Sequence, residues 1–174
     1  MIGELLYLKS IIEGTKPIAD SLAGWVGPDG ADQDFVYDGL WREIKTTGLS
    51  SDQISIHSLE QLGNRNDFGE LHIYRVDPCA PEAEGAFTLR TLIRYFVEKF
   101  SGDIGLIEDF TNKLNSVGYV DMEVYDNYPY KFFRSDVYDV NESFPRITRS
   151  DIRPEIIRTE YILSVSSIDG WKRG

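Results

Sequence analysis

The sequence predicts an α/β fold, in which helices flank one mixed β-sheet. Helical patterns alternate with strand patterns along 174 residues, a length that suits a single domain over 1–174 with a sizeable core. An Asp-Gly pair at Asp38 and Gly39, between two apolar-rich runs, predicts a tight β-hairpin. No internal repeat or low-complexity segment in the sequence argues for another architecture.

The N-terminal part is expected to be helical. Residues 2–13 form a helical pattern that Gly14 closes, and residues 17–25 predict a short second helix with Pro17 near its first turn. Glycines and prolines then make 24–30 a loop that leads into the hairpin.

Strands and helices alternate through the remainder of the chain. The predicted strands are 53–57, 69–77, most of the Tyr- and Phe-rich stretch 122–140, and 159–166. The predicted helices are 88–100 and 105–117, the second of which ends at Gly118. Residues 78–84 are expected to form a surface loop.

The turn of the hairpin fixes which side chains share a face. A two-residue turn pairs Tyr37 with Leu40, Val36 with Trp41, Phe35 with Arg42, and Asp34 with Glu43. Directly opposed residues lie on one face of the sheet, with Cβ atoms roughly 4.5–5.5 Å apart. Lys45 joins Glu43 on that face, and Ile44 points the other way. A loop one residue longer would instead place Asp34 opposite Arg42.

Two opposed carboxylates imply a cation between them. Asp34 and Glu43 would repel each other, and one would be pushed towards protonation unless a positive charge lies nearby. Mg²⁺ is a natural partner, because it is usually held by one or two carboxylates together with waters and phosphate oxygens. The alternative is an exposed hairpin with an ordinary surface ion pair.

An acidic residue, a turn and Glu-x-Lys on the returning strand resemble the signature of the PD-(D/E)XK nuclease superfamily. Further segments resemble, in order, the bacterial "PD-(D/E)XK motif protein" family, whose genes tend to lie near restriction and phage-defence genes. These segments are Gly-Glu-Leu-Leu-Tyr-Leu at 3–8, Trp-Val-Gly-Pro at 25–28, Glu-Ile-Lys-Thr-Thr at 43–47, Ser-Leu-Glu-Gln-Leu at 58–62, Gly-Tyr at 118–119 and Ser-Phe-Pro-Arg-Ile-Thr at 143–148. Members usually carry a further region ahead of the first helix, so this chain is expected to be a truncated product or a shorter member.

The resemblance implies a restriction-endonuclease-like core and a metal-dependent endonuclease that hydrolyses DNA. Asp34 and Glu43 would bind Mg²⁺, for which Mn²⁺ can substitute, and the backbone carbonyl of Ile44 would be a further ligand. Glu4, on the helix before the hairpin, would assist this ion or a second one. The bland alternative for Glu4 is a solvated first-turn residue that favours the helix dipole.

Two further side chains have roles that the resemblance implies. Lys45 would orient the attacking water or stabilise phosphate charge; its alternative is a cross-strand salt bridge with Asp32. Gln61 would support the water or contact phosphate. With only His57 and His72 in the chain, a histidine-based metal site is not compelling.

The charge distribution restricts how the chain would meet DNA. A net charge of −11 argues against binding through a uniformly basic surface. Residues 134–174 hold seven basic and seven acidic residues, and the first 133 hold 11 and 22. Arg146, Arg149 and Arg153 are therefore the candidate DNA-phosphate contacts, with Arg158 beside them. Their alternative partners are Asp151, Glu155 and Glu160.

Composition excludes several other classes of protein. No run of about 18 apolar residues predicts a transmembrane helix, and the N-terminus lacks a signal-peptide pattern. Cys79 is the single cysteine, which excludes a disulfide framework and a Cys-rich zinc site. No phosphate-binding loop of the P-loop type is present. A cytoplasmic protein is expected.

Three functions follow. The first is a DNA endonuclease of a restriction or phage-defence system, expected to work with partner proteins and as a homodimer. The second is a non-catalytic interaction subunit of such a complex that keeps the fold; intact Asp34, Glu43 and Lys45 count against it. The third is an unrelated structural α/β domain.

Overall fold

The computed structural model describes residues 1–14, 16–37, 39–63 and 68–174. In these ranges the α-helices are α1 (Ile2–Glu13), α2 (Ile18–Ala23), α3 (Leu89–Lys99) and α4 (Ile104–Ser116). The strands are β1 (Phe35–Tyr37), β2 (Leu40–Thr47), β3 (Gln53–Ile56), β4 (Gly69–Pro78), β5 (Ala86–Phe87), β6 (Tyr130–Val140) and β7 (Tyr161–Ser164). Short 3₁₀ helices cover Gly27–Asp29, Glu123–Asn127, Arg149–Asp151 and Ser166–Trp171.

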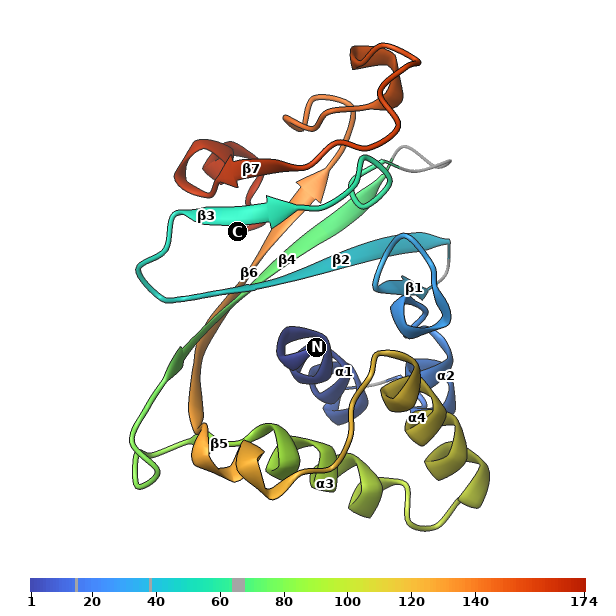
Figure 1. Ribbon diagram of the computed structural model, residues 1–174, viewed down its shortest axis with the longest axis vertical. Helices are drawn as coiled ribbons and strands as arrows, with labels where there is room; N and C mark the ends of the chain where they lie inside the picture. Colours follow the sequence, from blue (N-terminus) through green and yellow to red (C-terminus); the bar gives the residue numbers. More distant parts are fainter. Residues whose placement is uncertain (15, 38, 64–67) are drawn as a thin grey trace.

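A curled, five-stranded mixed sheet forms the middle of the fold, in the order β1-β2-β4-β6-β5. Strands β2 and β4 run parallel, and the other neighbours are antiparallel. The α-helices lie on one side of this sheet, and β3 and β7 lie on the other (Figure 1). The prediction of an α/β fold with a mixed sheet and flanking helices, consistent with a restriction-endonuclease-like core, is confirmed.

The prediction that all strands join one sheet is wrong. Strands β3 and β7 pair with each other, antiparallel, in a separate two-stranded sheet. Ile54 and Ile56 of β3 are buried, and the residues that alternate with them are exposed. The alternation that predicts a strand at 53–56 thus reflects a layer with one solvent-exposed face. Its other face packs on the main sheet.

Each face of the main sheet has its own apolar core. The larger core lies on the helical side and includes Leu5 and Leu8 of α1, Phe96 of α3 and Phe110 of α4. Ile44 of β2 belongs to this core, whereas Trp41 of the same strand belongs to the core on the β3–β7 side. Side chains alternate along a strand, so Glu43 and Lys45 lie on the β3–β7 face.

Most predicted boundaries agree with the structure to within two residues. Thr88 caps α3 by accepting a hydrogen bond from the Thr91 N–H, and Asp103 caps α4 in the same way. The second helix ends at Ala23 rather than at residue 25. In the stretch 122–140 the extended part begins only at Tyr130, after a 3₁₀ helix. None of the helices in the described ranges is long and apolar enough to cross a membrane.

Candidate active site

The hairpin has the register that the sequence predicts. Strand β1 pairs with β2 through Phe35 and Arg42, Val36 and Trp41, and Tyr37 and Leu40. Gly39 has φ +77°, the left-handed conformation that such a turn requires. Asp38, the other predicted turn residue, lies outside the described residues. Asp34 directly precedes β1, so its predicted pairing with Glu43 lies just outside the paired residues.

Asp34 is fixed by hydrogen bonds on both sides. Its backbone carbonyl accepts the N–H groups of Val26 and Gly27, at 2.9 and 3.0 Å. A Cβ at Gly27 would come within 3.2 Å of the Asp34 Cα and Oδ1 atoms, so this close approach favours glycine. Asp34 Oδ2 accepts the Ile44 N–H at 2.7 Å. The side chain therefore takes over the hydrogen bond that a longer β1 would have made to β2.

Glu43 is a buried carboxylate with one unpaired oxygen. Its side chain is 1 % exposed, and Oε1 forms an ion pair with Lys45 Nζ at 2.8 Å. Oε2 is buried and accepts no hydrogen bond from the described residues. Burial, and next the charge of Asp34, raise the pKa of Glu43 to about 8. Burial, and next the charge of Glu4, raise the pKa of Asp34 to about 7. The positive charge near Asp34 and Glu43 is therefore too small to hold the pKa values of both carboxyl groups in their usual range.

Glu4 reaches the same site from α1. A Cβ at Gly3 would lie 2.3 Å from Thr46 Oγ1, so the glycine lets α1 approach β2 closely. Glu4 Oε2 accepts the Trp25 Nε1–H at 3.0 Å, and Oε1 pairs with the Met1 amino group at 2.5 Å. The structure thus brings Glu4 near Asp34 and Glu43, with both of its oxygens already in contact with donors.

Lys45 and Gln61 meet on the β3–β7 side of the sheet. Lys45 Nζ donates to Gln61 Oε1 at 3.1 Å in addition to its ion pair with Glu43. Gln61 Oε1 also accepts the His57 N–H at 2.8 Å. In the described part of the chain, the alternative salt bridge between Lys45 and Asp32 is not formed, because the ammonium group faces Glu43 and Gln61.

The residues fit a divalent cation held by two carboxylates. Among the residues that the structure describes, no group of three or more His, Cys, Asp or Glu side chains is arranged to hold a metal ion. Asp34 and Glu43 remain as a pair, with one buried oxygen unpaired and with raised pKa values. Mg²⁺ commonly takes one or two carboxylates and completes its shell with water and substrate oxygens. The role of the Ile44 carbonyl stays a prediction.

The candidate phosphate arginines have different surroundings. Arg146 donates to the Leu62 carbonyl, and Arg149 donates to the carbonyls of Pro154 and Ile156 at 3.1 and 2.6 Å. Arg158 forms an ion pair with Glu160. Arg153 is exposed and has no side-chain partner in the described ranges. The structure therefore leaves Arg153 the most available of these cations, and their contacts with DNA stay predictions.

Two features of the site region could not be found from the sequence. Gln33 hydrogen-bonds to the loop that carries Gln61. The one signal for this contact in the sequence is that Gln33 directly precedes Asp34. Glu70 of β4 is a second buried carboxylate, which contacts Arg42, His72 and Arg173. No spacing in the sequence predicts that cluster, because Arg173 comes from the far end of the chain.

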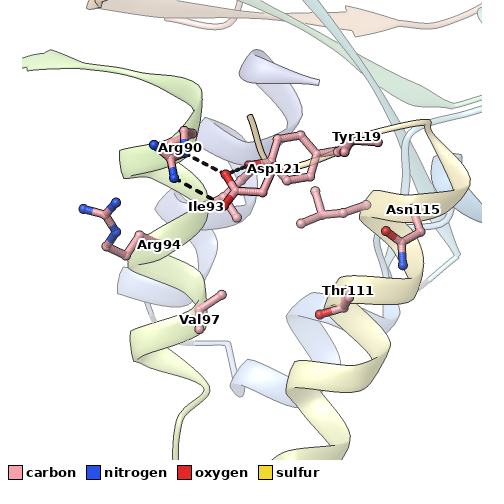
Figure 2. A pocket seen from close by; sticks show the side chains of 10 residues that line it. Arg90, Ile93, Arg94, Val97, Thr111, Asn115, Tyr119 and Asp121 are labelled. Carbon is pink, nitrogen blue, oxygen red and sulfur yellow. Dashed lines mark hydrogen bonds and ion pairs between the residues drawn. The ribbon is translucent and has the colours of Figure 1, made fainter. Parts of the chain in front are cut away.

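A separate pocket lies between α3 and α4 (Figure 2). Its volume is about 450 Å³, and Ile93, Val97 and Leu114 give it an apolar lining. At its rim Arg90 is already paired with Asp121, at 2.7 Å, and with Asp126. None of the site residues predicted from the sequence lines this pocket.

Fold and site together define a restriction-endonuclease-like α/β protein with an Asp…Glu-x-Lys arrangement at its hairpin. Residues 1–166 match the family model described as "Putative PD-(D/E)XK family member, (DUF4420)", and the chain belongs to this family. No curated protein and no solved structure matches the chain.

Proposed function

We propose that this protein is a Mg²⁺-dependent endonuclease that hydrolyses phosphodiester bonds in DNA, in the cytoplasm and as part of a bacterial restriction or phage-defence system. The observation that carries the proposal is the unpaired, buried Oε2 of Glu43, next to Asp34 and Lys45. A buried carboxylate oxygen without a hydrogen-bond partner costs stability. A divalent cation would supply the positive charge that the two carboxylates lack.

Asp34 and Glu43 would hold the Mg²⁺, with Glu4 and the Ile44 carbonyl as further ligands; Mn²⁺ can substitute. When bound, the ion lowers the pKa of a water and stabilises the added charge on the phosphate. For Glu4 to take part, one of its oxygens must exchange the Trp25 or the Met1 donor for the ion. The raised pKa values of the two carboxyls mean that they must lose protons before they bind it.

Lys45 supplies positive charge beside the carboxylates. Its ammonium group has three N–H donors, of which one points to Glu43 and one to Gln61. The third has no partner among the described residues and would meet a phosphate oxygen or the attacking water. Because the ion pair with Glu43 fixes the direction of the side chain, Lys45 is held ready before the substrate arrives.

DNA, a second copy of the chain and partner proteins complete the proposal. With a net charge of −11, the protein has little general attraction for DNA. Local cations such as Arg153, or a partner that carries its own DNA contacts, would hold the substrate. Cutting both strands with one site per chain would use a homodimer.

Cleavage of supercoiled plasmid with Mg²⁺ or Mn²⁺ tests the proposal. The wild-type chain is compared with Glu43→Ala and Lys45→Ala, and Glu155→Ala serves as an exposed control. Nicking or linearisation by wild type and control alone establishes a nuclease and assigns its centre. Calorimetric Mn²⁺ binding that is lost in Glu43→Ala, without cutting, indicates an intact site that needs a partner. Neither cutting nor metal binding favours the interaction subunit.

A further inference from the structure

The loop 57–63 is tied to the segment that carries Asp34. Gln33 Nε2 donates to the Glu60 carbonyl at 2.5 Å and to the Gly63 carbonyl at 3.1 Å. These two bonds use both protons of the amide group. Gln33 directly precedes Asp34 in the chain. One short segment therefore carries a proposed metal ligand and also forms hydrogen bonds with the loop.

Core packing and a second side-chain hydrogen bond fix the other side of the loop 57–63. Leu59 and Leu62 are buried, and Leu62 belongs to the core on the β3–β7 side. Arg146 donates to the Leu62 carbonyl. The loop carbonyls of Glu60, Leu62 and Gly63 therefore all accept side-chain hydrogen bonds from distant parts of the sequence, and the turn cannot rotate without breaking them.

The Gln61 side chain at the tip of this loop has a defined orientation. Its acceptor atom receives two donors, Lys45 Nζ and the His57 N–H. Both partners can only donate, so the amide oxygen must be the atom that faces them. The Gln61 NH₂ group has no partner in the part of the chain that the structure describes. Gln61 can thus offer only hydrogen-bond donors, which suit an anionic oxygen and cannot take a proton from water.

We propose that Gln33 is a positioning residue that locks the loop 57–63, so that Gln61 donates a hydrogen bond to a substrate phosphate oxygen. The inference rests on the proposed nuclease function for the substrate, but the lock itself is a property of the free chain. Gln33 acts through Gln61, Glu60 and Gly63 and does not touch the reacting atoms.

Amide hydrogen exchange of the full chain tests the lock without any activity. Gln33→Met keeps the approximate side-chain size and removes both donors. The His57 amide, which donates to Gln61, should exchange about tenfold faster in this variant, because the loop opens more often. Gln53→Met is the control: Gln53 is exposed on β3, and its side chain makes no hydrogen bond in the described ranges. Unchanged exchange in Gln33→Met overturns the positioning role, whether or not the chain cleaves DNA.

Cleavage kinetics test the link to Gln61. We expect Gln61→Ala to lower kcat about 10²-fold, which is typical for loss of one oriented donor, and Gln33→Met to lower it about tenfold. Calorimetric Mn²⁺ affinity should stay unchanged in both variants. The double variant should be no slower than Gln61→Ala, since Gln33 acts through Gln61. If the two losses in kcat multiplied in the double variant, Gln33 would not act through Gln61.

Gln61→Glu separates a donor from an acceptor. The carboxylate can still accept from Lys45 and His57, but it has nothing to donate to phosphate. It should be at least as slow as Gln61→Ala, and wild-type activity in Gln61→Glu would overturn the donor role. A wild-type chain that neither cuts nor binds Mn²⁺ refutes the proposed function and with it the phosphate contact, while His57 exchange still decides whether Gln33 holds the loop in place.

Discussion

Glu43 and Glu70 are two buried carboxylates on neighbouring strands, and their surroundings are opposite. On the helical face, Glu70 contacts Arg42, His72 and Arg173, at 2.8–2.9 Å. The hydrogen bond from His72 and the arginine charges lower its pKa to about 2. On the other face, Glu43 has one lysine for two oxygens and a second carboxylate nearby, and its pKa rises to about 8.

The difference between Glu43 and Glu70 indicates which buried carboxylate of this sheet is a candidate functional group. Burial alone does not mark a site, because both side chains are almost removed from water. Glu70 has more cationic partners than it needs, and its cluster ties the C-terminal Arg173 to the sheet. Glu43 has fewer cationic partners than it needs, and such a deficit is typical of a site at which a ligand binds. We therefore expect Glu70 to contribute to stability and propose Glu43 as the functional carboxylate.

The largest effect is expected for Glu43→Gln. Removing the charge should abolish Mn²⁺ binding and slow plasmid cleavage by about 10³-fold or more, since a metal ion contributes several kcal/mol to the transition state. Glu70→Gln should retain both properties. Calorimetry and cleavage measure them. If Glu70→Gln lost metal binding as completely as Glu43→Gln, the division between the two glutamates would be wrong.

Denaturant unfolding should rank the two variants the other way round: Glu70→Gln should lose stability, and Glu43→Gln should not. Glu70→Gln leaves Arg42 without its charge partner and Arg173 with Asp139 alone. We expect a loss of about 2–3 kcal/mol, below the range for fully buried pairs because Arg173 is half-exposed. Glu43→Gln, without metal at pH 8, should unfold at higher denaturant than wild type, because it no longer buries a charged oxygen without a hydrogen-bond partner beside Asp34. Glu155→Gln, on the surface, serves as the reference. A stabilised Glu70→Gln would contradict the structural role.

The pH dependence should separate the same two residues. Glu43 has a pKa raised above its unfolded value, so the folded state binds the proton more tightly and its contribution to stability falls as pH rises from about 4.5 to about 8. Glu70 has a lowered pKa, so its contribution is present above about 4.5 and is lost as pH falls towards 2. Metal-free stability measured from pH 4 to 9 should decline at the alkaline end, and less so in Glu43→Gln.

Metal binding should show the reverse trend. The ion binds the deprotonated carboxylates, so Mn²⁺ affinity should increase with pH through the range 7–8 and protons should be released on binding. Calorimetry in two buffers of different ionisation enthalpy counts those protons. An affinity that is flat between pH 6 and 9 would show that Asp34 and Glu43 are already ionised in the free protein.

Local chemistry explains which parts of the structure the sequence could predict. The register of the hairpin follows from one turn, and the alternation of a strand then places Glu43 and Lys45 on one face and Ile44 on the other. Helix ends follow from residues such as Thr88 and Asp103. These features depend on neighbours in sequence, so residue types and their spacing are sufficient.

Features that depend on long-range pairing could not be predicted in this way. The β3–β7 sheet joins residues about 100 positions apart, and nothing in 53–56 specifies its partner. The same holds for the contact of Gln33 with the loop 57–63 and for the bond between Arg146 and Leu62. The resemblance predicted a role for Gln61 but not the direction of its amide, which depends on Lys45 and His57 together.

The smallest effect concerns the exposed arginines, which extend the comparison from carboxylates to cations. Arg153 has no partner in the described ranges, whereas Arg158 is paired with Glu160. In a cleavage-inactive Glu43→Gln background, Arg153→Ala should weaken DNA binding a few-fold and reduce the slope of log affinity against log salt by about 0.9. Arg158→Ala should leave that slope unchanged, because Glu160 already neutralises this cation. Fluorescence anisotropy over a salt series measures both. Equal slopes in the two variants would mean that pairing within the chain does not decide which arginine meets phosphate.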